Sequence, residues 1–529
     1  MKKIIYIFLF LFSSGDCVLA QFQQDWVSRF NNAVSGEDDA YSIDVDHFGN
    51  SYVTGRSYNG YNYDIITVKY SQQGSLLWIR TFNGSANQDD IPVKMRVDSE
   101  GNIYVSGNTR HSAQVNGEDF LILKYNSAGN VEWSKTYNGI DNLQDNLKDL
   151  TIDSAGYVYV TGIIGRYNFA DYCTIKYNSN GDTVWTRKYR DSIFAYSNPS
   201  SILVDNSGNV YVTGCAQYSP VGSDVVTIKY SAIGQILWNK RYTSANSGYS
   251  YDYVNDIMVD GFGNVFITGS QQTTGNSDFC TIKYNSVGVQ QWVVVYNYGI
   301  DDSKSIVVDN IGNSYITGES GFRICTIKYN QNGIQQWIRR YDEVSKSNKM
   351  VIDLSGNIYI TGVILNNFIT VKYNSLGDNL WESRYNGPAG LEDYSNDIIV
   401  GVDNNVYVTG QSFGSGTHFD YCTIKYSQPI GINPISSEIP NEFSLFQNYP
   451  NPFNPSTKIK FAIPTGYASQ TILSVYDILG RRVAVLVNQQ LRPGTYEVDW
   501  DASAYPSGVY FYTITSGSFK ETRKMVLLK

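Results

Sequence analysis

The sequence has few of the residues that catalytic and nucleic-acid-binding sites usually require. It contains three histidines among 529 residues, and it shows no Ser-His-Asp order, His-Glu-x-x-His motif, phosphate-binding loop or EF-hand loop. Its formal net charge is −9, which argues against a nucleic-acid partner because such a partner requires a basic face. We therefore expect no cofactor, no metal site and no catalytic residue set that the sequence itself would reveal.

Long apolar runs are also scarce. The apolar segment at residues 4–12 follows two lysines and is too short to span a bilayer. A V-x-A pattern then ends at Ala20, as signal peptidases require. We expect residues 1–20 to be a cleaved signal peptide, Gln21 to begin the mature protein, and no transmembrane segment to follow.

Paired cysteines are absent as well. The six cysteines form no adjacent pair and no zinc-like C-x-x-C pair. Cys173, Cys280, Cys325 and Cys422 occupy one position of a repeated phrase in which other copies have isoleucine, leucine or valine. Exchange with branched aliphatic residues indicates a buried apolar position. We expect these four, together with Cys215, to be free thiols that are mostly buried.

The abundant residues indicate β-structure. Tyrosine occurs 44 times and glycine 46 times, while charged residues make up 17% of the chain, a balance that suits short extracellular strands joined by turns. Four phrases recur in fixed order, each eight times, as in SIDVDHFGN (42–50), SYVTG (51–55), ITVKY (66–70) and LLWIRTF (76–82). Each phrase is rich in β-branched and aromatic residues, which predicts a strand.

Four antiparallel strands per repeat indicate a propeller blade. One tryptophan precedes the first repeat, whereas the last repeat ends near residue 426 without its tryptophan phrase. The N-terminal segment can therefore complete the eighth blade and remove exposed sheet edges. We predict an all-β chain with an eight-bladed β-propeller, closed by the N-terminal strand, over residues 21–428. The blade tryptophans, which we expect to stabilise it, are Trp26, Trp78, Trp133, Trp185, Trp238, Trp292, Trp337 and Trp381.

The phrases resemble the SBBP family of β-propeller repeats, whose pattern includes VD-x-x-GN-x-YVTG. The resemblance covers about residues 22–428 and rests on eight copies. The hairpin N-x-x-G-x-x-x-W is also similar to that of PQQ-type eight-bladed propellers, in which the tryptophan packs between blades. The adjacent cysteine pair of PQQ enzymes has no counterpart in this sequence.

The repeats also carry polar residues. Asp171 has aspartate counterparts in five other copies, and we interpret it as a strand-entry or turn residue because a catalytic carboxylate is rarely needed six times. Lys69 ends its strand toward the rim that holds Asp46. We hypothesise a ring of such Lys–Asp contacts, each stabilising the fold by about 0–1 kcal/mol.

Two connections per repeat hardly vary, whereas the two at the opposite rim vary greatly. Variable loops on a rigid scaffold commonly bind ligands, although solvated loops without a ligand are the alternative at every position. The tyrosines that could stack on a sugar or pack against a protein partner are Tyr58, Tyr61, Tyr167, Tyr249 and Tyr251.

The C-terminal part departs from the repeat. Residues 429–441 form a linker, and residues 442–529 contain about seven short alternating segments that predict a small Ig-like β-sandwich. The motifs NYPNPFNP (448–455), GTY (494–496) and GVY (508–510) closely resemble the type A sorting domain of type IX secretion, the Por secretion tail. This resemblance implies export through the periplasm, a partner in the type IX machinery, and a place outside or on the surface of a Gram-negative bacterium.

We therefore expect an exported, surface-displayed binding or scaffold protein rather than an enzyme, with an extracellular glycan or protein as its ligand. The alternative is a hydrolase or lyase that acts on extracellular polysaccharide in the propeller channel. An enzyme should place two or more carboxylates from non-repeating positions in that channel.

Overall fold

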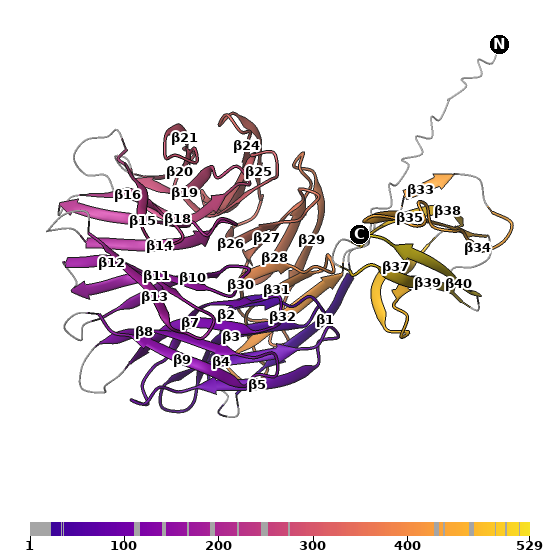
Figure 1. Cartoon of the computed structure of the whole chain (residues 1–529), viewed down its shortest axis with the longest axis horizontal. Helices are drawn as coiled ribbons and strands as arrows, with labels where there is room; N and C mark the ends of the chain where they lie inside the picture. Colours follow the sequence, from indigo (N-terminus) through magenta and orange to yellow (C-terminus); the bar gives the residue numbers. More distant parts are fainter. Residues whose placement is uncertain are drawn as a thin grey trace, which may run out of the picture. The chain divides into compact units, whose positions relative to one another are not determined.

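The computed structural model describes residues 23–529 except 33, 35, 111–116, 140–143, 167–168, 191–195, 220–221, 245–251, 273–275, 428–432, 437–439, 465–469, 492, 503–504 and 518. The chain divides into two compact units, Gln24–Ser427 and a second one formed chiefly by Gln428–Lys529 (Figure 1). The predicted cleavage site at Ala20 and Gln21 lies outside the described residues.

The larger unit consists of eight four-stranded antiparallel sheets. In the first seven, consecutive strands pair in sequence order. The first four contain β2 (Asp38–Val45), β3 (Ser51–Tyr58), β4 (Tyr63–Tyr70) and β5 (Leu76–Phe82); β6 (Ile91–Val97), β7 (Ile103–Arg110), β8 (Glu118–Tyr125) and β9 (Val131–Tyr137); β10 (Asn146–Ile152), β11 (Val158–Arg166), β12 (Phe169–Tyr177) and β13 (Thr183–Tyr189); and β14 (Tyr196–Val204), β15 (Val210–Ser219), β16 (Gly222–Tyr230) and β17 (Ile236–Tyr242). The next three contain β18 (Asp252–Val259), β19 (Val265–Gln272), β20 (Ser277–Tyr284) and β21 (Gln290–Tyr296); β22 (Asp301–Val308), β23 (Ser314–Ser320), β24 (Arg323–Tyr329) and β25 (Gln335–Arg340); and β26 (Ser345–Ile352), β27 (Ile358–Ile364), β28 (Asn367–Tyr373) and β29 (Asn379–Tyr385).

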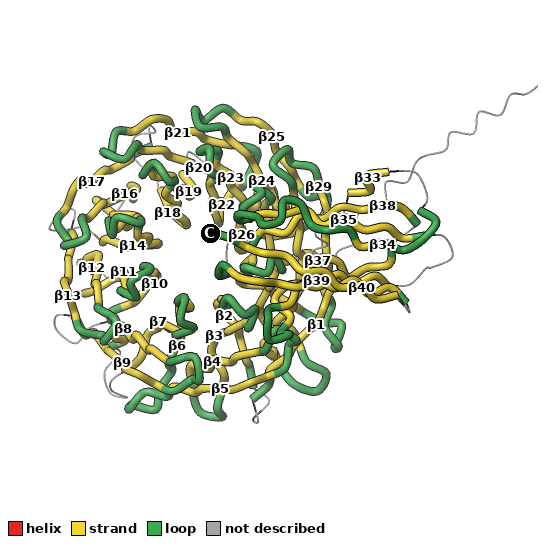
Figure 2. Tube along the Cα trace, turned by 45° about the vertical axis from the view of Figure 1, so that its right-hand side comes forward, coloured by secondary structure: helices red, strands yellow, loops and turns green. Residues whose placement is uncertain are grey.

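The eighth sheet joins the two ends of the larger unit. Its order is β1-β32-β31-β30, so β1 (Gln23–Phe30) pairs beside β32 (Phe419–Ser427), followed by β31 (Val406–Phe413) and β30 (Asp393–Val400). Figure 2 shows the sheets arranged in a ring, with β2, β6, β10, β14, β18, β22 and β26 toward the centre. The unit is thus all-β and consistent with a β-propeller.

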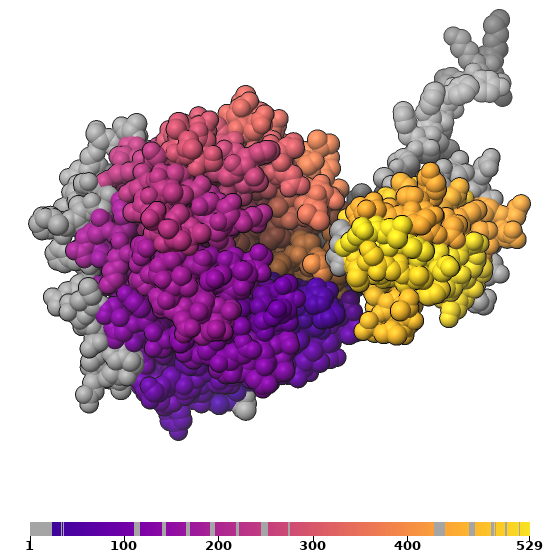
Figure 3. Space-filling view, viewed as in Figure 1, coloured from indigo at the N-terminus to yellow at the C-terminus, as the bar shows by residue number. Residues whose placement is uncertain are grey.

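The first sheet packs against the eighth. Ile43 and Val53 of the first sheet share one buried cluster with Tyr407 and Tyr421 of the eighth. In the space-filling view, the indigo surface of the first strands borders the orange surface of the last sheet (Figure 3). Hydrophobic burial therefore continues across the point where the two ends of the unit meet.

The strands bury both faces because each sheet is covered by a neighbour on either side. In β3, residues 51–55 are buried without interruption, although the sequence pattern alternates between apolar and small polar residues. The polar side chains on these strands pair with one another, as Thr54 does with Thr67 through their hydroxyls at 3.2 Å. Such pairing removes the cost of burying unpaired hydroxyl groups.

Five-residue hairpins join the first two strands of a sheet, and a second set joins the last two. In the first hairpin of the chain, Asp46 accepts backbone N–H bonds from Phe48 and Asn50, both at 2.9 Å. Gly49 has φ of 78°, which only glycine adopts without strain. Because the strands are antiparallel, both sets of hairpins lie at one rim, here called the hairpin rim. The other connections form the loop rim.

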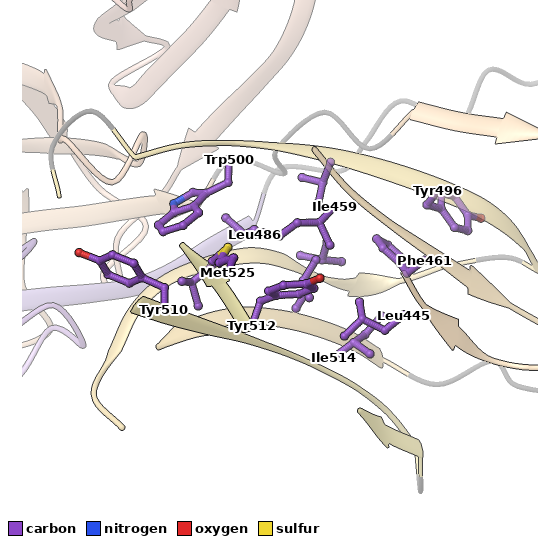
Figure 4. Close-up of a cluster of buried hydrophobic side chains, with 14 of the residues drawn as sticks. Leu445, Ile459, Phe461, Leu486, Tyr496, Trp500, Tyr510, Tyr512, Ile514 and Met525 are labelled. Atoms are coloured by element: carbon purple, nitrogen blue, oxygen red, sulfur yellow. The ribbon is translucent and has the colours of Figure 1, made fainter. Parts of the chain in front are cut away.

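The smaller unit contains two further four-stranded sheets. One has β33 (Asn433–Ser436), β38 (Gly494–Asp501), β35 (Ser456–Ile463) and β34 (Ser444–Leu445) in that order; the other has β37 (Arg482–Gln490), β36 (Gln470–Tyr476), β39 (Gly508–Ser516) and β40 (Phe519–Leu527). Both sheets contribute to one apolar core, in which Ile459 and Phe461 of the first sheet pack with Tyr512 and Ile514 of the second (Figure 4). This core is separate from those of the larger unit.

Candidate functional site

The strands β2, β6, β10, β14, β18, β22, β26 and β30, here called the inner strands, each have a β-bulge at the same place. A bulge leaves one residue unpaired and redirects the side chains beside it. The residue that follows the bulge links neighbouring inner strands, and the eight together are here called the inner belt. In the order of the sheets they are Ser42, Lys94, Asp149, Ser201, Asp256, Ser305, Lys349 and Asp397.

Asp149 shows how the inner belt is built. One carboxylate oxygen accepts hydrogen bonds from Lys94 Nζ at 2.5 Å and from the Leu150 amide at 2.8 Å. The other accepts from the Ser201 hydroxyl and the Ile202 amide, both at 2.9 Å. Burial opposes ionisation of Asp149, but Lys94 and these hydrogen bonds outweigh it and lower the pKa of the carboxyl. Asp149 thereby ties three consecutive sheets together.

Asp256 and Asp397 repeat this arrangement. Asp256 accepts from the Ser305 hydroxyl at 2.8 Å and from Lys349 Nζ at 3.1 Å. Asp397 accepts from the Ser42 hydroxyl at 3.1 Å, across the point where the eighth sheet meets the first. Each aspartate therefore joins its own strand to the next one around the ring.

The inner belt contains three carboxylates, the kind of group that a channel enzyme would require. They share one structural position, but the other five sheets have serine or lysine there. Asp149, Asp256 and Asp397 each accept hydrogen bonds at both oxygens. A general acid needs a raised pKa, whereas the pKa of Asp149 is lowered. Their partners are backbone amides and neighbouring side chains, so these groups act as links between strands.

A second set of contacts joins the sheets at the hairpin rim. The tryptophan indole and the repeated lysine of one sheet both donate to a single backbone carbonyl in the next sheet's hairpin. The indole bonds measure 3.0–3.2 Å and the lysine bonds 2.8–3.4 Å. The six carbonyls that accept both bonds belong to Gln72, Ser179, Ala232, Ser286, Gln331 and Ser375.

The hairpin glycine completes this junction. At Gly288, φ is 80°, and a β-carbon would lie 2.9 Å from the Trp238 ring of the preceding sheet. The sequence pattern N-x-x-G-x-x-x-W thus places in each hairpin a glycine on which the previous tryptophan rests. A β-carbon would lie 2.7–2.9 Å from the preceding sheet's indole ring at Gly74, Gly181, Gly234, Gly288, Gly333 and Gly377.

The predicted Lys–Asp contacts are present, as between Lys425 and Asp403 at 3.6 Å, but the repeated lysine also bonds to the next sheet. Lys69 Nζ lies 4.0 Å from Asp46, but it also sits 4.8 Å from the Tyr52 ring centroid and donates to the Ser127 carbonyl at 3.2 Å. The Tyr52 hydroxyl in turn donates to Asp46 at 3.0 Å. Burial lowers the pKa of Lys69, while Asp46 partly offsets that effect. Lys69 therefore contacts both the predicted carboxylate and a carbonyl of the next sheet, and the carbonyl is the nearer acceptor.

A polar hollow of about 390 Å³ belongs to one of these junctions. It lies between the fifth and sixth sheets, and its lining includes Lys283, Trp292 and Gln331. Both Lys283 and Trp292 already donate to the Gln331 carbonyl, each at 3.0 Å. The hollow therefore reflects the junction and supplies no unused catalytic group.

Asp171 and Asp420 occupy equivalent positions in their sheets, and both form ion pairs with arginine at the loop rim. Asp171 binds Arg190 through both of its oxygens, and Asp420 binds Arg29 at 2.7 Å. The cysteine two residues further along, Cys173, is free and buried, as its exchange with aliphatic residues predicted. Burial raises the pKa of its thiol to about 12, which leaves too little thiolate for nucleophilic chemistry.

The predicted ligand tyrosines are only partly described. Tyr61 is 88% exposed at the tip of the β3–β4 loop, where its amide donates to the Asn59 side chain at 2.9 Å. Tyr58 is half-buried, donates its hydroxyl to the Gly60 carbonyl at 3.0 Å, and packs 5.4 Å from the Tyr63 ring. Tyr167, Tyr249 and Tyr251 lie outside the described residues.

Sequence reasoning missed the residues that support this loop. Arg56 lies 4.4 Å from the Tyr63 ring centroid and forms an ion pair with Asp39 at 2.7 Å. The Tyr63 hydroxyl donates to Glu37 at 2.7 Å. These residues occupy positions that differ between repeats, and that variation is the feature of the sequence by which they could have been recognised. Together with Tyr58 and Tyr61 they form a patch on the first sheet, here called the tyrosine patch.

A second aromatic group at the loop rim was also missed. Tyr298 is 66% exposed, and the Arg340 guanidinium lies 3.3 Å from its ring centroid. The Arg340 side chain also donates to the Ser320 carbonyl at 2.9 Å, which fixes its position. A stacked Arg–Tyr pair therefore occupies this part of the loop rim.

Two further features concern the described residues as a whole. None of their helices has the length and apolar character that crossing a membrane requires. Nowhere among them do three or more histidine, cysteine, aspartate or glutamate side chains converge to hold a metal ion.

The family comparison identifies the C-terminal part. Residues 447–528 match the family model of the secretion system C-terminal sorting domain, Por_Secre_tail. This match confirms the resemblance of the C-terminal module, and such a domain indicates a secreted or cell-surface protein that interacts with type IX secretion machinery. The model does not extend over the repeats, so their likeness to SBBP repeats stays a prediction.

Several solved structures of other proteins show a distant similarity to this chain. PorZ of Porphyromonas gingivalis, a surface component of the type IX secretion system, is 12% identical, covers 93% of this chain and 74% of its own, and has a TM-score of 0.41. Sqt1 of Chaetomium thermophilum is 7% identical with a TM-score of 0.46, and the polysaccharide lyase Uly1 is 12% identical with a TM-score of 0.43; each covers 76% of this chain and 99% of its own. No curated protein matches the sequence. Similarities at this level assign no substrate or activity.

Proposed function

We propose that this protein is a secreted, surface-displayed binding or scaffold protein built on an eight-bladed β-propeller. In this proposal residues 1–20 are a cleaved signal peptide, residues 21–428 form the propeller that β1 closes, and residues 429–441 are a linker. Residues 442–529 form an Ig-like sorting domain that delivers the protein to the cell surface. The eight four-stranded sheets and the place of β1 beside β32 support the closed ring.

The ligand is a glycan or protein bound at the loop rim. The observation that carries this proposal is a contrast between the repeated lysines and tryptophans, which bond to neighbouring sheets, and the tyrosine patch, which includes an exposed ring. The repeated lysines and tryptophans are engaged in junctions between sheets, as Lys283 and Trp292 are at Gln331. The tyrosine patch instead places Tyr61, 88% exposed, on a loop that arginine and asparagine side chains hold in position. Aromatic faces of this kind stack on sugars or pack into protein interfaces.

A binding screen tests this function. The purified protein is applied to a glycan array and to extracellular matrix proteins, together with Tyr61→Ala and Tyr449→Ala. Tyr449 is a matched control because it is also an exposed tyrosine, 79% accessible, but belongs to the smaller unit. We expect Tyr61→Ala to weaken binding by at least about tenfold, the effect of losing an aromatic anchor, and Tyr449→Ala to retain it. Equal loss in both variants, or no ligand in either library, contradicts the proposal.

The second candidate is a polysaccharide hydrolase or lyase with its site in the channel. The observation in its favour is the set of three inner-belt carboxylates, Asp149, Asp256 and Asp397. Their hydrogen bonds to backbone amides favour a structural role. Release of reducing ends or unsaturated sugars from anionic polysaccharides, lost in Asp256→Asn, would establish the enzyme instead.

A further inference from the structure

The hairpin rim carries an arc of exposed apolar side chains. They lie within the five-residue hairpins of the first and the fourth to eighth sheets, and each is between 55% and 89% exposed. This set, here called the apolar crescent, consists of Phe48, Ile233, Phe262, Val287, Val289, Ile311, Ile334, Leu354, Leu376 and Val402.

The turns themselves do not require these residues. Phe262 and Glu100 occupy the same hairpin position, and each donates its backbone amide to the preceding aspartate at 2.9 Å. The two hairpins are thus built alike, and the side chain that extends from the third position is unconstrained. In the second and third sheets the equivalent positions hold Glu100, Ala128, Ala155 and Asn180. The crescent is therefore confined to one part of the rim.

The members of the crescent lie next to one another. Within a sheet, the two hairpins touch: a β-carbon on Gly263 would lie 3.2 Å from Ser286, and one on Gly312 would lie 3.8 Å from Gln331. Between sheets, the next sheet's hairpin supports the indole of the preceding sheet, as found for Trp185, Trp238, Trp292 and Trp337. Ten side chains of this size and exposure present roughly 700–1,000 Å² of apolar surface. That area exceeds what a monomer usually exposes and approaches the ~800 Å² per partner of a stable interface.

The charges of the crescent restrict what can cover it. Its hairpins contain no lysine or arginine of their own. The guanidinium groups of Arg187 and Arg339 reach them from the preceding sheets, but they already donate to the carbonyls of Ile233, Gly234 and Gly377, which leaves few free cations for an anionic lipid or polysaccharide surface. Their aspartates are already engaged, as Asp46 is with Asn50 and Tyr52. An apolar, uncharged surface is the complementary partner. The hairpins concerned are 46–50, 231–235, 260–264, 285–289, 309–313, 330–334, 353–357, 374–378 and 401–405.

We infer that the apolar crescent is the interface of a homodimer, in which two copies of this chain meet hairpin rim to hairpin rim. A crescent on each copy supplies the apolar surface that the other requires, and a two-fold axis makes the contact self-complementary. The loop rims of both copies then face away from the interface. Two ligand sites would therefore be presented in opposite directions.

Sedimentation of the full chain tests the inference. Analytical ultracentrifugation over about 0.1–100 µM spans the dissociation constants expected for an interface of this area. We expect a dimer that Phe262→Ser/Ile311→Ser/Leu354→Ser weakens by at least about 100-fold, because apolar anchors at the centre of an interface carry most of its affinity. The control Val131→Ser/Val184→Ser/Val295→Ser removes three exposed apolar residues outside the crescent and should leave the dimer intact.

Two additional measurements separate the outcomes. Circular dichroism checks that both triple variants are folded; if the crescent variant is unfolded, Leu354→Lys/Leu376→Lys, which charges the crescent at its exposed turns, must dissociate the dimer in its place. A protein that is monomeric throughout the concentration range overturns the inference. So does a dimer that the crescent variants leave unchanged, or a wild-type protein that sediments with neutral phosphatidylcholine vesicles as a monomer.

Discussion

The indole nitrogen of Trp26 donates a hydrogen bond of 3.0 Å to the backbone carbonyl of Gln72. Trp26 lies in β1 of the eighth sheet, and Gln72 lies in the β4–β5 hairpin of the first. The same carbonyl accepts a bond from Lys425 at 3.4 Å. A strand from the N-terminus and a strand from the end of the repeats thus supply the two donors that consecutive strands of the chain supply at the other junctions. The strength of those junctions can be measured.

Gly288 should be among the least replaceable residues of the larger unit. Alanine there must adopt φ of 80° and meets the Trp238 ring at 2.9 Å. We expect Gly288→Ala to lower the free energy of unfolding by about 2–4 kcal/mol. Gly261, in a hairpin of the same sheet, has no neighbouring atom within 4 Å. Gly261→Ala should change stability by less than about 0.5 kcal/mol in urea denaturation; similar costs for both would contradict the junction.

Asp90 should make the protein less stable at neutral pH than at pH 4. Burial raises the pKa of its carboxyl to about 6 from an ordinary 3.8, and Asp64 and Asp89 add to the effect. A raised folded-state pKa means that the contribution to stability is fully present below the unfolded pKa and is lost as pH rises through 6. Asp90→Asn keeps an acceptor for the Gly84 amide without the charge. It should therefore stabilise the protein by about 1–3 kcal/mol at pH 7.5.

The advantage of Asp90→Asn should shrink steadily toward pH 4 and disappear only below the ordinary pKa of 3.8, where the wild-type carboxyl is protonated in both the folded and the unfolded state. Chemical denaturation at pH 4, 5, 6 and 7.5 follows this change. An advantage that is constant across the range, or that grows toward low pH, would show that burial of the charge is not the cause.

Lys94 and Asp149 should be strongly coupled. Lys94→Met leaves the Asp149 carboxylate buried without its cation, and we expect a loss of about 3–5 kcal/mol. Asp149→Asn should cost less, because the amide oxygen still accepts a bond from the Ile202 amide. In a double-mutant cycle, the coupling energy should be about 1–3 kcal/mol. Coupling near zero would mean that the 2.5 Å contact contributes nothing to the inner belt.

The repeats made most of the strand order predictable from sequence. Because Trp, Lys, Gly and Asp recur at fixed spacing, their positions indicated four strands per sheet and the donation of β1 to the last sheet. The partner of Lys69 was not predictable in the same way. Its acceptor, the Ser127 carbonyl, belongs to the next sheet, and a repeat pattern gives no information on which backbone oxygen will lie nearby.

The inner belt escaped sequence analysis for a different reason. Ser42, Lys94 and Asp149 occupy one structural position but have no chemistry in common. Each of these residues pairs with a different residue type in the next sheet. The pattern is therefore one of complementary neighbours, which a search for identical residues in each repeat does not find. The tyrosine patch was predicted only in part. Arg56 and Tyr63 lie in strands β3 and β4, and the sequence does not show that their side chains contact Asp39 and Glu37.

The most direct test of the account compares Trp26→Ala with Trp185→Ala in one thermal unfolding experiment. Both indoles donate to a hairpin carbonyl of the next sheet, Trp26 at 3.0 Å and Trp185 at 3.2 Å. If β1 closes the ring, each substitution should lower stability by about 2–4 kcal/mol, with Trp26→Ala at least half as costly as Trp185→Ala. A silent Trp26→Ala beside a costly Trp185→Ala would contradict the account.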